Sequence, residues 1–183
     1  MCCRMTLFKT LEEILGEVGP VQTDIGNDAY KRSYNIPPSS RVPVLWRSGD
    51  ACVNLSYFHW GLSFHFGGQE KPLANLRIET LWKKTPFLAR QPLNACVALC
   101  DGYYEWRHEG GRKIPYHIHA PSFKLLTLAG VWRKDRADEA GSFLIVTRPA
   151  RADVAFIHDR MPLIITPDRR DEWLAYGGER LTE

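Results

Sequence analysis

Hydrophobic and polar positions alternate in short runs along most of the chain, and this pattern predicts β-strands. The runs RVPVLW and ACVNLSYF, separated by RSGD, predict a hairpin over residues 41–58. Five later runs are also strand-like: ACVALC (95–100), IPYHIHA (114–120), LLTLAGVW (125–132), SFLIVT (142–147) and LIIT (163–166). Long helices do not separate these runs, so we expect antiparallel pairing and not a doubly wound parallel sheet.

Helical signals are fewer. Thr10 and Glu13 match a capping box in front of an apolar stripe, and a Gly-Pro pair follows that stripe. The segment 167–176 starts with proline, which is favoured at the first helical position. A brief helix is predicted over 76–82, and the polar stretch before Ser40 has an irregular pattern. We therefore expect an α+β fold: a single domain of mostly antiparallel β-sheet curled toward a barrel, with a few peripheral helices.

Composition bounds the class of protein. The chain has 183 residues, of which 44% are hydrophobic and 25% charged, as is usual for a globular domain that buries its own core. It contains no run of eighteen apolar residues and no signal-peptide pattern at its start. We expect a cytoplasmic protein, associated with the nucleoid, or a nuclear one if the source is eukaryotic. The net charge of +3 is compatible with nucleic acid but does not argue for it alone.

The cysteines and histidines give little support to a metal or disulfide site. Five cysteines is an odd count, which argues against a disulfide framework. Cys96 and Cys100 lie about 13 Å apart along a strand, too far for a bond, so we expect them to be core residues. His117 and His119 share a strand face about 6.6 Å apart, but no third ligand has suitable spacing. We expect no metal.

Cys2 directly follows Met1. Removal of Met1 would leave an α-amine with an ordinary pKa of about 8 beside a thiol with an ordinary pKa of about 8.5. Both groups would then have reactive fractions at neutral pH. The amine condenses with an aldehyde to an imine, and the thiol then closes a five-membered thiazolidine ring. An internal cysteine cannot do this, because its nitrogen is in an amide. A start-site accident remains the alternative interpretation.

Three other side chains have the chemistry to help such a reaction. Glu105 stands among aromatic residues in DGYYEW, where a carboxyl group tends to keep its proton and can act as a general acid. His158 in IHDRMP is a natural proton shuttle, and the amide of Asn75 can position a carbonyl or hydroxyl group. Three arginines could hold phosphates: Arg4, Arg77 and Arg160. For each residue, an ordinary surface or structural role remains open.

Taken together, these segments resemble the SRAP family, the SOS-response-associated peptidases, also described as abasic-site processing proteins. The matching stretches run in family order from Met1 to about Trp173: MCCR, YNIPPSSRVPVL, WGL, NLRIET, CVALCDGYYEW, PYHI, LAGVW, FLIVTRPA and IHDRMPLII. Each stretch is weak alone, but their number, order and spacing are specific. The resemblance also implies a β-rich α+β domain, in agreement with the strand pattern.

The resemblance implies a function for the site. The processed Cys2 would form a thiazolidine cross-link with the open-chain aldehyde of an abasic site in single-stranded DNA. By analogy, Asn75 positions the sugar, Glu105 assists ring opening and imine formation, and His158 assists proton transfer and reversal. The family positions that hold backbone phosphates match Arg4, Arg77 and Arg160. An autoproteolytic peptidase activity is also implied. We expect no cofactor and a monomeric protein.

The chain departs from the family pattern in several places. Cys3 stands where the family usually has glycine, and Leu76 replaces the usual alanine. After WGL the family has a proline and a tryptophan, whereas this chain has SFHFGG, so Phe64 and Phe66 are expected to stack on DNA bases. We expect one SRAP-like domain over residues 1–183, without the C-terminal segment that longer members carry.

Two rival functions stay open at this point. An N-terminal-nucleophile hydrolase acting on amides would also need a free Cys2, with its thiol as nucleophile and its amine as base. A single-stranded-DNA-binding module without catalysis would bind in a salt-sensitive way, show no preference for abasic sites and not depend on Cys2.

Overall fold

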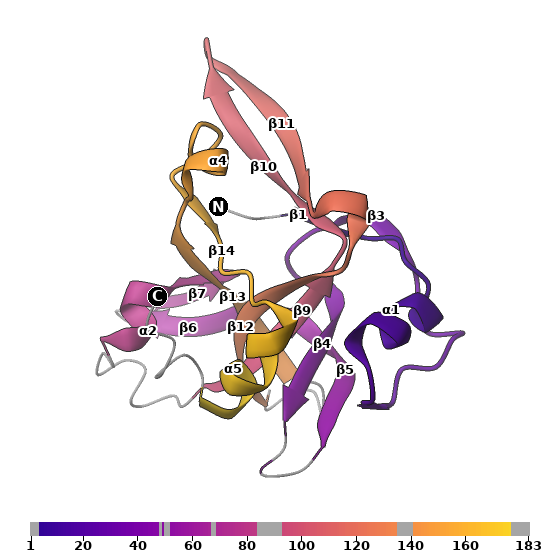
Figure 1. Ribbon diagram of the computed structural model, residues 1–183. Helices are drawn as coiled ribbons and strands as arrows, with labels where there is room; N and C mark the ends of the chain where they lie inside the picture. The colour runs from indigo at the N-terminus through magenta and orange to yellow at the C-terminus, as the bar shows by residue number, and fades with distance from the viewer. Residues whose placement is uncertain are drawn as a thin grey trace.

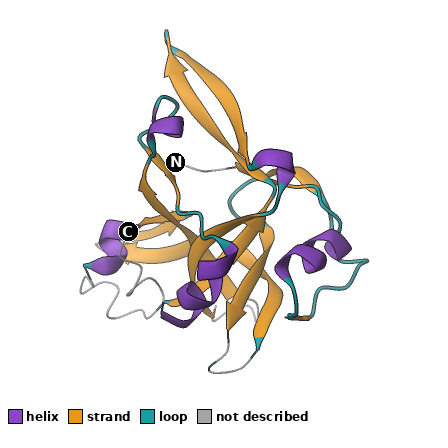
Figure 2. Cartoon of the chain, viewed as in Figure 1, coloured by secondary structure: helices purple, strands orange, loops and turns teal. Residues whose placement is uncertain are grey.

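The computed structural model describes residues 4–47, 49, 52–66, 69–83, 93–134 and 141–176, and strands dominate these parts of the chain (Figures 1 and 2). The strands are β1 (Arg4–Leu7), β2 (Gln22–Thr23), β3 (Ser33–Ile36), β4 (Arg41–Arg47), β5 (Val53–Trp60), β6 (Leu62–Phe66), β7 (Gln69–Leu73), β8 (Asn75–Arg77), β9 (Asn94–Cys100), β10 (Gly102–Glu109), β11 (Arg112–His119), β12 (Leu126–Lys134), β13 (Gly141–Pro149) and β14 (Arg160–Pro162). The α-helices are α1 (Leu11–Val18), α2 (Ile78–Trp82), α4 (Ala152–Ala155) and α5 (Arg170–Tyr176). None of the helices in these described ranges is long and apolar enough to span a bilayer.

The largest sheet curls until strands from its two ends meet. Its order is β14, β13, β12, β9, β4, β5 and β2, and β5 also pairs with β13, at Ser142 with His59 and at Phe143 with Trp60. This extra pairing closes a ring of hydrogen-bonded strands. The neighbours β12–β13, β9–β12, β4–β9 and β4–β5 are antiparallel, whereas the closing pair is parallel. The predicted α+β fold, with a mostly antiparallel sheet curled toward a barrel and peripheral helices, is confirmed.

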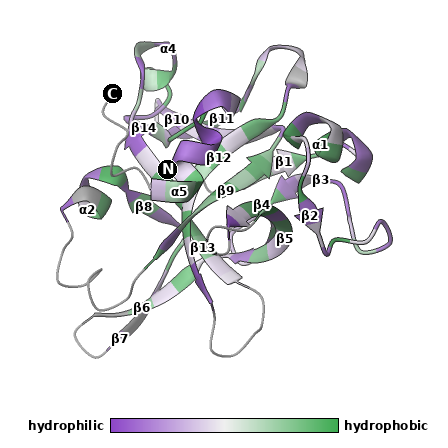
Figure 3. Cartoon of the chain, turned by 60° about the horizontal axis from the view of Figure 1, so that its bottom comes forward, coloured by the Kyte–Doolittle hydropathy of each residue, from purple (hydrophilic) through white to green (hydrophobic). Residues whose placement is uncertain are grey.

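Each of the five ring strands contributes large side chains to one hydrophobic core. Hydrophobic residues recur along β4, β5 and β9 (Figure 3). The ring supplies these fully buried side chains, among others: Leu45, Leu55, Leu99, Leu128 and Phe143. Burying one such side chain contributes about 1.5–3 kcal/mol. Cys96 and Cys100 also lie fully buried in this core, as predicted, and burial raises the pKa of the Cys96 thiol well above its usual value.

A second sheet runs in the order β11, β10, β1 and β3. Its long β10–β11 hairpin projects from the rest of the molecule (Figure 1). Gly110 and Gly111 form the two-residue turn of this hairpin with φ of +54° and +77°, and such a turn requires two residues that tolerate positive φ. At the base of the hairpin, Tyr103 and its β1 partner Met5 are almost fully buried, so this sheet shares the main core.

Helix α1 begins and ends where the sequence indicates. The Thr10 hydroxyl accepts a hydrogen bond from the Glu13 amide (3.2 Å), and the Glu13 carboxylate accepts one from the Thr10 amide (2.7 Å). The predicted capping box is therefore confirmed. The helix ends at Gly19, which has φ of +79°.

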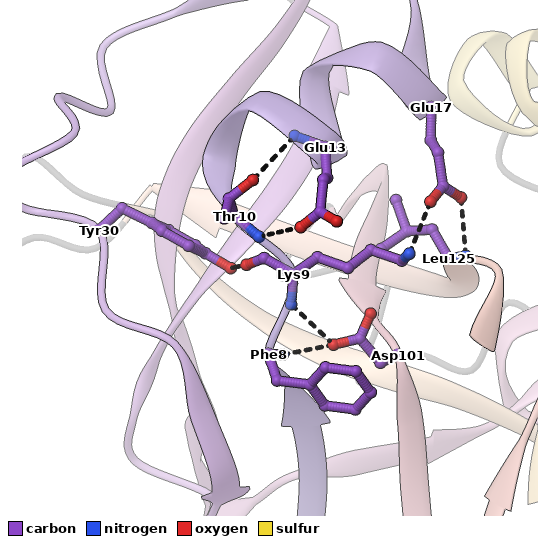
Figure 4. Close-up of polar contacts among 8 residues, drawn as sticks. All are labelled: Phe8, Lys9, Thr10, Glu13, Glu17, Tyr30, Asp101 and Leu125. Carbon is purple, nitrogen blue, oxygen red and sulfur yellow. Dashed lines mark hydrogen bonds and ion pairs between the residues drawn. The ribbon is translucent and has the colours of Figure 1, made fainter.

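A polar network fixes the junction between β1 and α1 (Figure 4). The fully buried Asp101, at the turn from β9 to β10, accepts hydrogen bonds from the amides of Phe8 and Lys9. Lys9 Nζ lies 2.9 Å from Glu17 Oε1, and the other Glu17 oxygen accepts a bond from the Leu125 amide (2.8 Å). Burial raises the pKa of Asp101, although the two amide donors act in the opposite direction. These bonds hold the end of β1 against the start of β10.

The run at 163–166 is not a strand, which corrects the prediction. The Leu163 amide donates to Val146 of β13 (2.9 Å), whereas Ile164 forms a single bridge with Leu128 of β12. Its backbone thus bonds to β13 at one residue and to β12 around one bridge, which is too short a pairing for a strand. The regular strand nearby is β14, which ends just before this run.

Two further boundaries differ from the sequence prediction. The short helix predicted over 76–82 begins only at Ile78, because the residues before it pair with β13 as β8. The stretch read as irregular contains β3, which pairs with β1 at Ile36 and Ser33 across a register shift. Only Ile36 in β3 is buried, so this strand has little hydrophobic signal.

Candidate functional site

Glu105 lies in β10 and is 4% exposed. Its cross-strand partner is Tyr116 of β11, and the residue before it, Tyr104, pairs with Arg4 of β1. This burial agrees with the predicted packing of the carboxyl group inside the protein, whereas its role as a general acid stays a prediction. Cys2 and Cys3 lie outside the described residues, so the geometry of the predicted nucleophile stays a prediction.

Asn75 and Arg77 lie on β8, which pairs with β13 at Ile145 and Thr147. Leu76, between them, is 6% exposed and belongs to the core. Because side chains alternate along a strand, Asn75 and Arg77 share the opposite face. Arg77 is exposed there and Asn75 is partly buried, so a substrate could reach the guanidinium of Arg77.

Arg160 is held by other protein groups. Its guanidinium donates to both carboxylate oxygens of Glu79 (2.6 and 3.0 Å) and to the carbonyl oxygen of Thr147 (2.7 Å). The Arg160 side chain is 10% exposed. The hydrogen bond from Arg160 lowers the pKa of Glu79, outweighing the partial burial of that carboxyl. A phosphate that bound Arg160 would have to replace Glu79 as its partner.

His158 follows α4 in the loop that leads to β14. Its Nδ1 accepts a hydrogen bond from the Arg160 amide (2.9 Å), and Asp159 Oδ1 lies 2.8 Å from the same nitrogen. The amide needs the Nδ1 lone pair, whereas a bond to Asp159 needs a proton on Nδ1. We assign the amide bond to the neutral ring and the Asp159 ion pair to the protonated ring, since the 84% exposed Asp159 side chain can also be solvated.

Phe156 brings this loop to the β10–β11 hairpin. Its ring meets Tyr116 edge-on, with centroids 5.8 Å apart, and the Arg107 guanidinium carbon lies 5.9 Å from the Phe156 centroid. Figure 1 shows α4 beside β10. Because Tyr116 is the cross-strand partner of Glu105, this contact places the His158 loop next to the strand that carries Glu105.

Of the two phenylalanines predicted to stack on bases, Phe64 is fully buried in the core. The Arg133 guanidinium carbon lies 5.1 Å from its ring centroid, and Arg133 also donates to the Ser63 carbonyl. A ring without exposed surface cannot stack on a base, so the prediction for Phe64 is wrong for this conformation. The side chain of Phe66 lies outside the described side chains, and its role stays a prediction.

His117 and His119 share one face of β11, with ring centroids 5.4 Å apart. The Thr6 hydroxyl lies 3.0 Å from His117 Nε2. Burial, followed by the nearby His119, lowers the pKa of His117. Among the residues that the structure describes, no three His, Cys, Asp or Glu side chains are close enough to hold a metal ion.

Sequence reasoning missed Glu79 and Phe156. Glu79 stands two residues after Arg77 in the NLRIET stretch, but nothing in the sequence indicates that Arg160, 81 positions later, is its partner. Phe156 is 55% exposed. The sequence signal that could have found it is an aromatic residue directly before IHDRMP.

The fold and the site define a β-rich protein with a closed ring of strands and a buried carboxyl group on a second sheet. The loop with His158 packs on the hairpin of that sheet through Phe156. The chain belongs to the SOS response associated peptidase (SRAP) family, whose family model matches residues 1–183. The predicted family is therefore confirmed.

Named relatives agree with this assignment. The abasic site processing protein YedK of Escherichia coli K12 is 31% identical, over 95% of this chain and 79% of its own. The abasic site processing protein YoqW of Bacillus subtilis 168 is 32% identical, over 95% of this chain and 80% of its own. A crystal structure of a Bacteroides thetaiotaomicron protein matches with a TM-score of 0.75 at 25% identity, over 94% of this chain and 81% of that one.

Proposed function

We propose that this protein captures abasic sites in single-stranded DNA through a covalent thiazolidine link to Cys2, formed after Met1 is removed. It acts as a monomer and needs no cofactor. The names of its relatives support an abasic site as the lesion, since both YedK and YoqW are called abasic site processing proteins. The same site also serves as an autoproteolytic peptidase that releases the residue before Cys2.

The capture has two bond-forming steps. The free α-amine of Cys2 attacks the aldehyde carbon of the ring-opened sugar, and loss of one water gives an imine. The thiolate then adds to the imine carbon, the nitrogen takes up a proton, and the five-membered ring closes. Glu105 donates the proton that opens the sugar and expels water, His158 moves protons, and Asn75 positions the sugar. No electrons are exchanged with an outside reagent.

The observation that carries this proposal is the pairing of Arg4 with Tyr104. Arg4 is two residues after Cys2, and two residues of chain span at most about 7 Å. Glu105 follows Tyr104 directly and is 4% exposed, so the two-residue span from Cys2 to Arg4 is long enough to let Cys2 approach this buried carboxyl group. The Phe156–Tyr116 contact supports the presence of His158 on the same side.

The arginines support binding of a phosphate backbone. Arg77 is exposed on β8 and Arg4 donates to Asn35 (2.9 Å) at the start of β1. Guanidinium groups bind phosphate oxygens in pairs, which fixes the register of the strand without reading its sequence. Arg160 would join them only after exchanging Glu79 for a phosphate.

The test uses protein whose lack of Met1 is verified by intact mass. It is incubated with a single-stranded oligonucleotide that carries one abasic site. We expect an adduct that survives heat and detergent, with the summed mass of both partners minus one water. Cys2→Ala should give no such adduct, whereas the matched Cys3→Ala variant should still give it. An oligonucleotide with a non-ring-opening abasic analogue should give none.

Several outcomes would contradict the proposal. Wild-type protein without an adduct, or an equal adduct from Cys2→Ala, would exclude capture by Cys2. Turnover of small amides without DNA would favour the hydrolase, and salt-sensitive binding that ignores the lesion would favour the non-catalytic module. For the peptidase step, retention of Met1 in Glu105→Gln but not in wild type is expected.

A further inference from the structure

Three segments that are distant in the sequence meet at Arg160. Its side chain reaches Glu79 on α2 through two hydrogen bonds and Thr147 on β13 through its carbonyl oxygen and, at 3.3 Å, its hydroxyl oxygen. Its backbone amide donates to His158 Nδ1. One residue therefore connects a carboxylate on one side of β13 to the imidazole of the His158 loop.

This connection acts on the proton of the imidazole. A neutral histidine carries one proton, on either Nδ1 or Nε2. The Arg160 amide occupies the lone pair of Nδ1 and so leaves the proton on Nε2. The competing partner is Asp159, whose oxygen lies 2.8 Å from Nδ1 and would hold a proton there. The amide can keep this bond only while the Arg160 backbone, which pairs with Pro149 of β13, stays in place.

We propose that Glu79 is a positioning residue that holds the neutral His158 ring in its Nε2–H form by anchoring Arg160. This inference rests on the proposed function only for its catalytic consequence; the ring state itself can be measured without DNA. The bidentate geometry suits the task, since two parallel bonds fix a guanidinium in orientation as well as in distance. Thr147 supplies the third fixed point on the main sheet.

A simpler role must be distinguished. Glu79 could merely occupy the place of a phosphate on Arg160 until DNA arrives. In that case its removal would leave His158 unchanged, strengthen DNA binding and leave capture as fast as before or faster. The positioning role predicts the opposite for the ring and for the rate of capture.

The first experiment is nitrogen-15 spectroscopy of the histidine rings, without DNA, at about pH 8, where an ordinary histidine is neutral. In wild type we expect His158 to show an unprotonated Nδ1 and a protonated Nε2. In Glu79→Gln we expect a mixture of the two neutral forms. Glu79→Asp keeps the charge but shortens the side chain by one carbon, so it should fall between them.

Two control variants define the alternatives. Glu17→Gln removes a carboxylate from the Lys9 ion pair beside α1 and should leave the His158 signals unchanged. Asp159→Asn removes the competing partner and should leave the Nε2–H form in place. If Asp159→Asn shifts the ring and both Glu79 variants do not, Asp159 sets the ring state and the proposal is overturned. Unchanged His158 signals in both Glu79 variants overturn it as well.

The second experiment measures capture of an abasic oligonucleotide at saturating DNA, together with the Kd for DNA. Glu79→Gln should slow capture about tenfold or more, because proton transfer from a correctly held group contributes about 10²–10⁴ in rate, while its Kd is not weakened. Capture at wild-type rate overturns the catalytic consequence. Altered ring signals with no capture even by wild type would instead reject the proposed function and keep the positioning inference.

Discussion

Two regions of the molecule bury different kinds of groups: the closed ring of strands, and the margin, by which we mean Glu105 on β10 and the loop from His158 to Arg160. In the ring, the side chains that have no exposure are nearly all apolar, as along β9 and β13. At the margin, Glu105 is 4% exposed and the Arg160 side chain 10% exposed. A buried polar or charged group is costly unless it has partners. The ring therefore stabilises the fold through apolar burial, whereas the margin buries polar groups that depend on their partners.

Phe143→Ala should have the largest effect on stability. Phe143 is fully buried where β13 closes the ring against Trp60. Its removal should lower the free energy of unfolding by about 3–5 kcal/mol, because a cavity remains in the core. Denaturant unfolding followed by fluorescence measures this, and the folded fraction should still capture abasic DNA. The control is Tyr34→Ala, which removes a 69% exposed ring and should cost less than about 1 kcal/mol.

Glu105→Gln tests the margin. The variant is first freed of Met1 with a methionine aminopeptidase, as verified by intact mass, so that only the capture step is compared. The amide keeps the shape of the carboxyl group but cannot donate a proton as an acid, so capture should slow about 100-fold. The free energy of unfolding should change little, since the amide fills the same buried space as the carboxyl group. Adduct formation against time and a denaturant curve measure the two effects. Unchanged capture together with a loss of several kcal/mol in stability would mean that Glu105 belongs with the structural residues.

Thr10→Ala alters the cap of α1, which neither closes the ring nor takes part in the proposed chemistry. The variant loses the hydroxyl that caps α1 and should destabilise the protein by about 1 kcal/mol. Thermal unfolding measures this shift, and the rate of capture should stay the same. A change in that rate would show that α1 affects the site through the Lys9–Asp101 network.

The smallest expected effect is the pH dependence at Glu79. Arg160 lowers the pKa of this carboxyl in the folded state, so its stabilising contribution is complete above the ordinary carboxyl pKa of about 4.3 and is lost as the pH falls through the lowered value. Wild type should exceed Glu79→Gln in unfolding free energy near neutral pH, by less than about 1 kcal/mol because Glu79 is 41% exposed. The difference should close in acid. A constant difference would exclude titration of Glu79 as its cause.

The sequence predicts those parts of the fold whose signals are local. The capping box at Thr10 and the β4–β5 hairpin depend on residues close in the chain, and both are present. The closing pair between Phe143 and Trp60 is not local, and the pattern of neither strand predicts which strand it pairs with. The run at 163–166 was misread for a related reason: its apolar residues are bound by two neighbouring strands and not by one ladder.

For the site, the sequence identified residue types better than their partners. The sequence predicts that Glu105 is packed inside the protein, and its 4% exposure agrees. For Arg160 the sequence could not reveal Glu79, because a residue with five donors suits a phosphate and a carboxylate equally well. The prediction for Phe64 is wrong because the sequence does not show which face of a strand is buried, and Phe64 lies on the buried face.

The placement of β1 has a consequence for synthesis on the ribosome. Arg4 is translated well before its partner, because Tyr104 follows it by a hundred residues. At about 5–20 residues per second, this partner is translated about 5–20 s afterwards. For that whole interval β1 lacks this partner, and the sheet that carries Glu105 is completed only after β11 has been made.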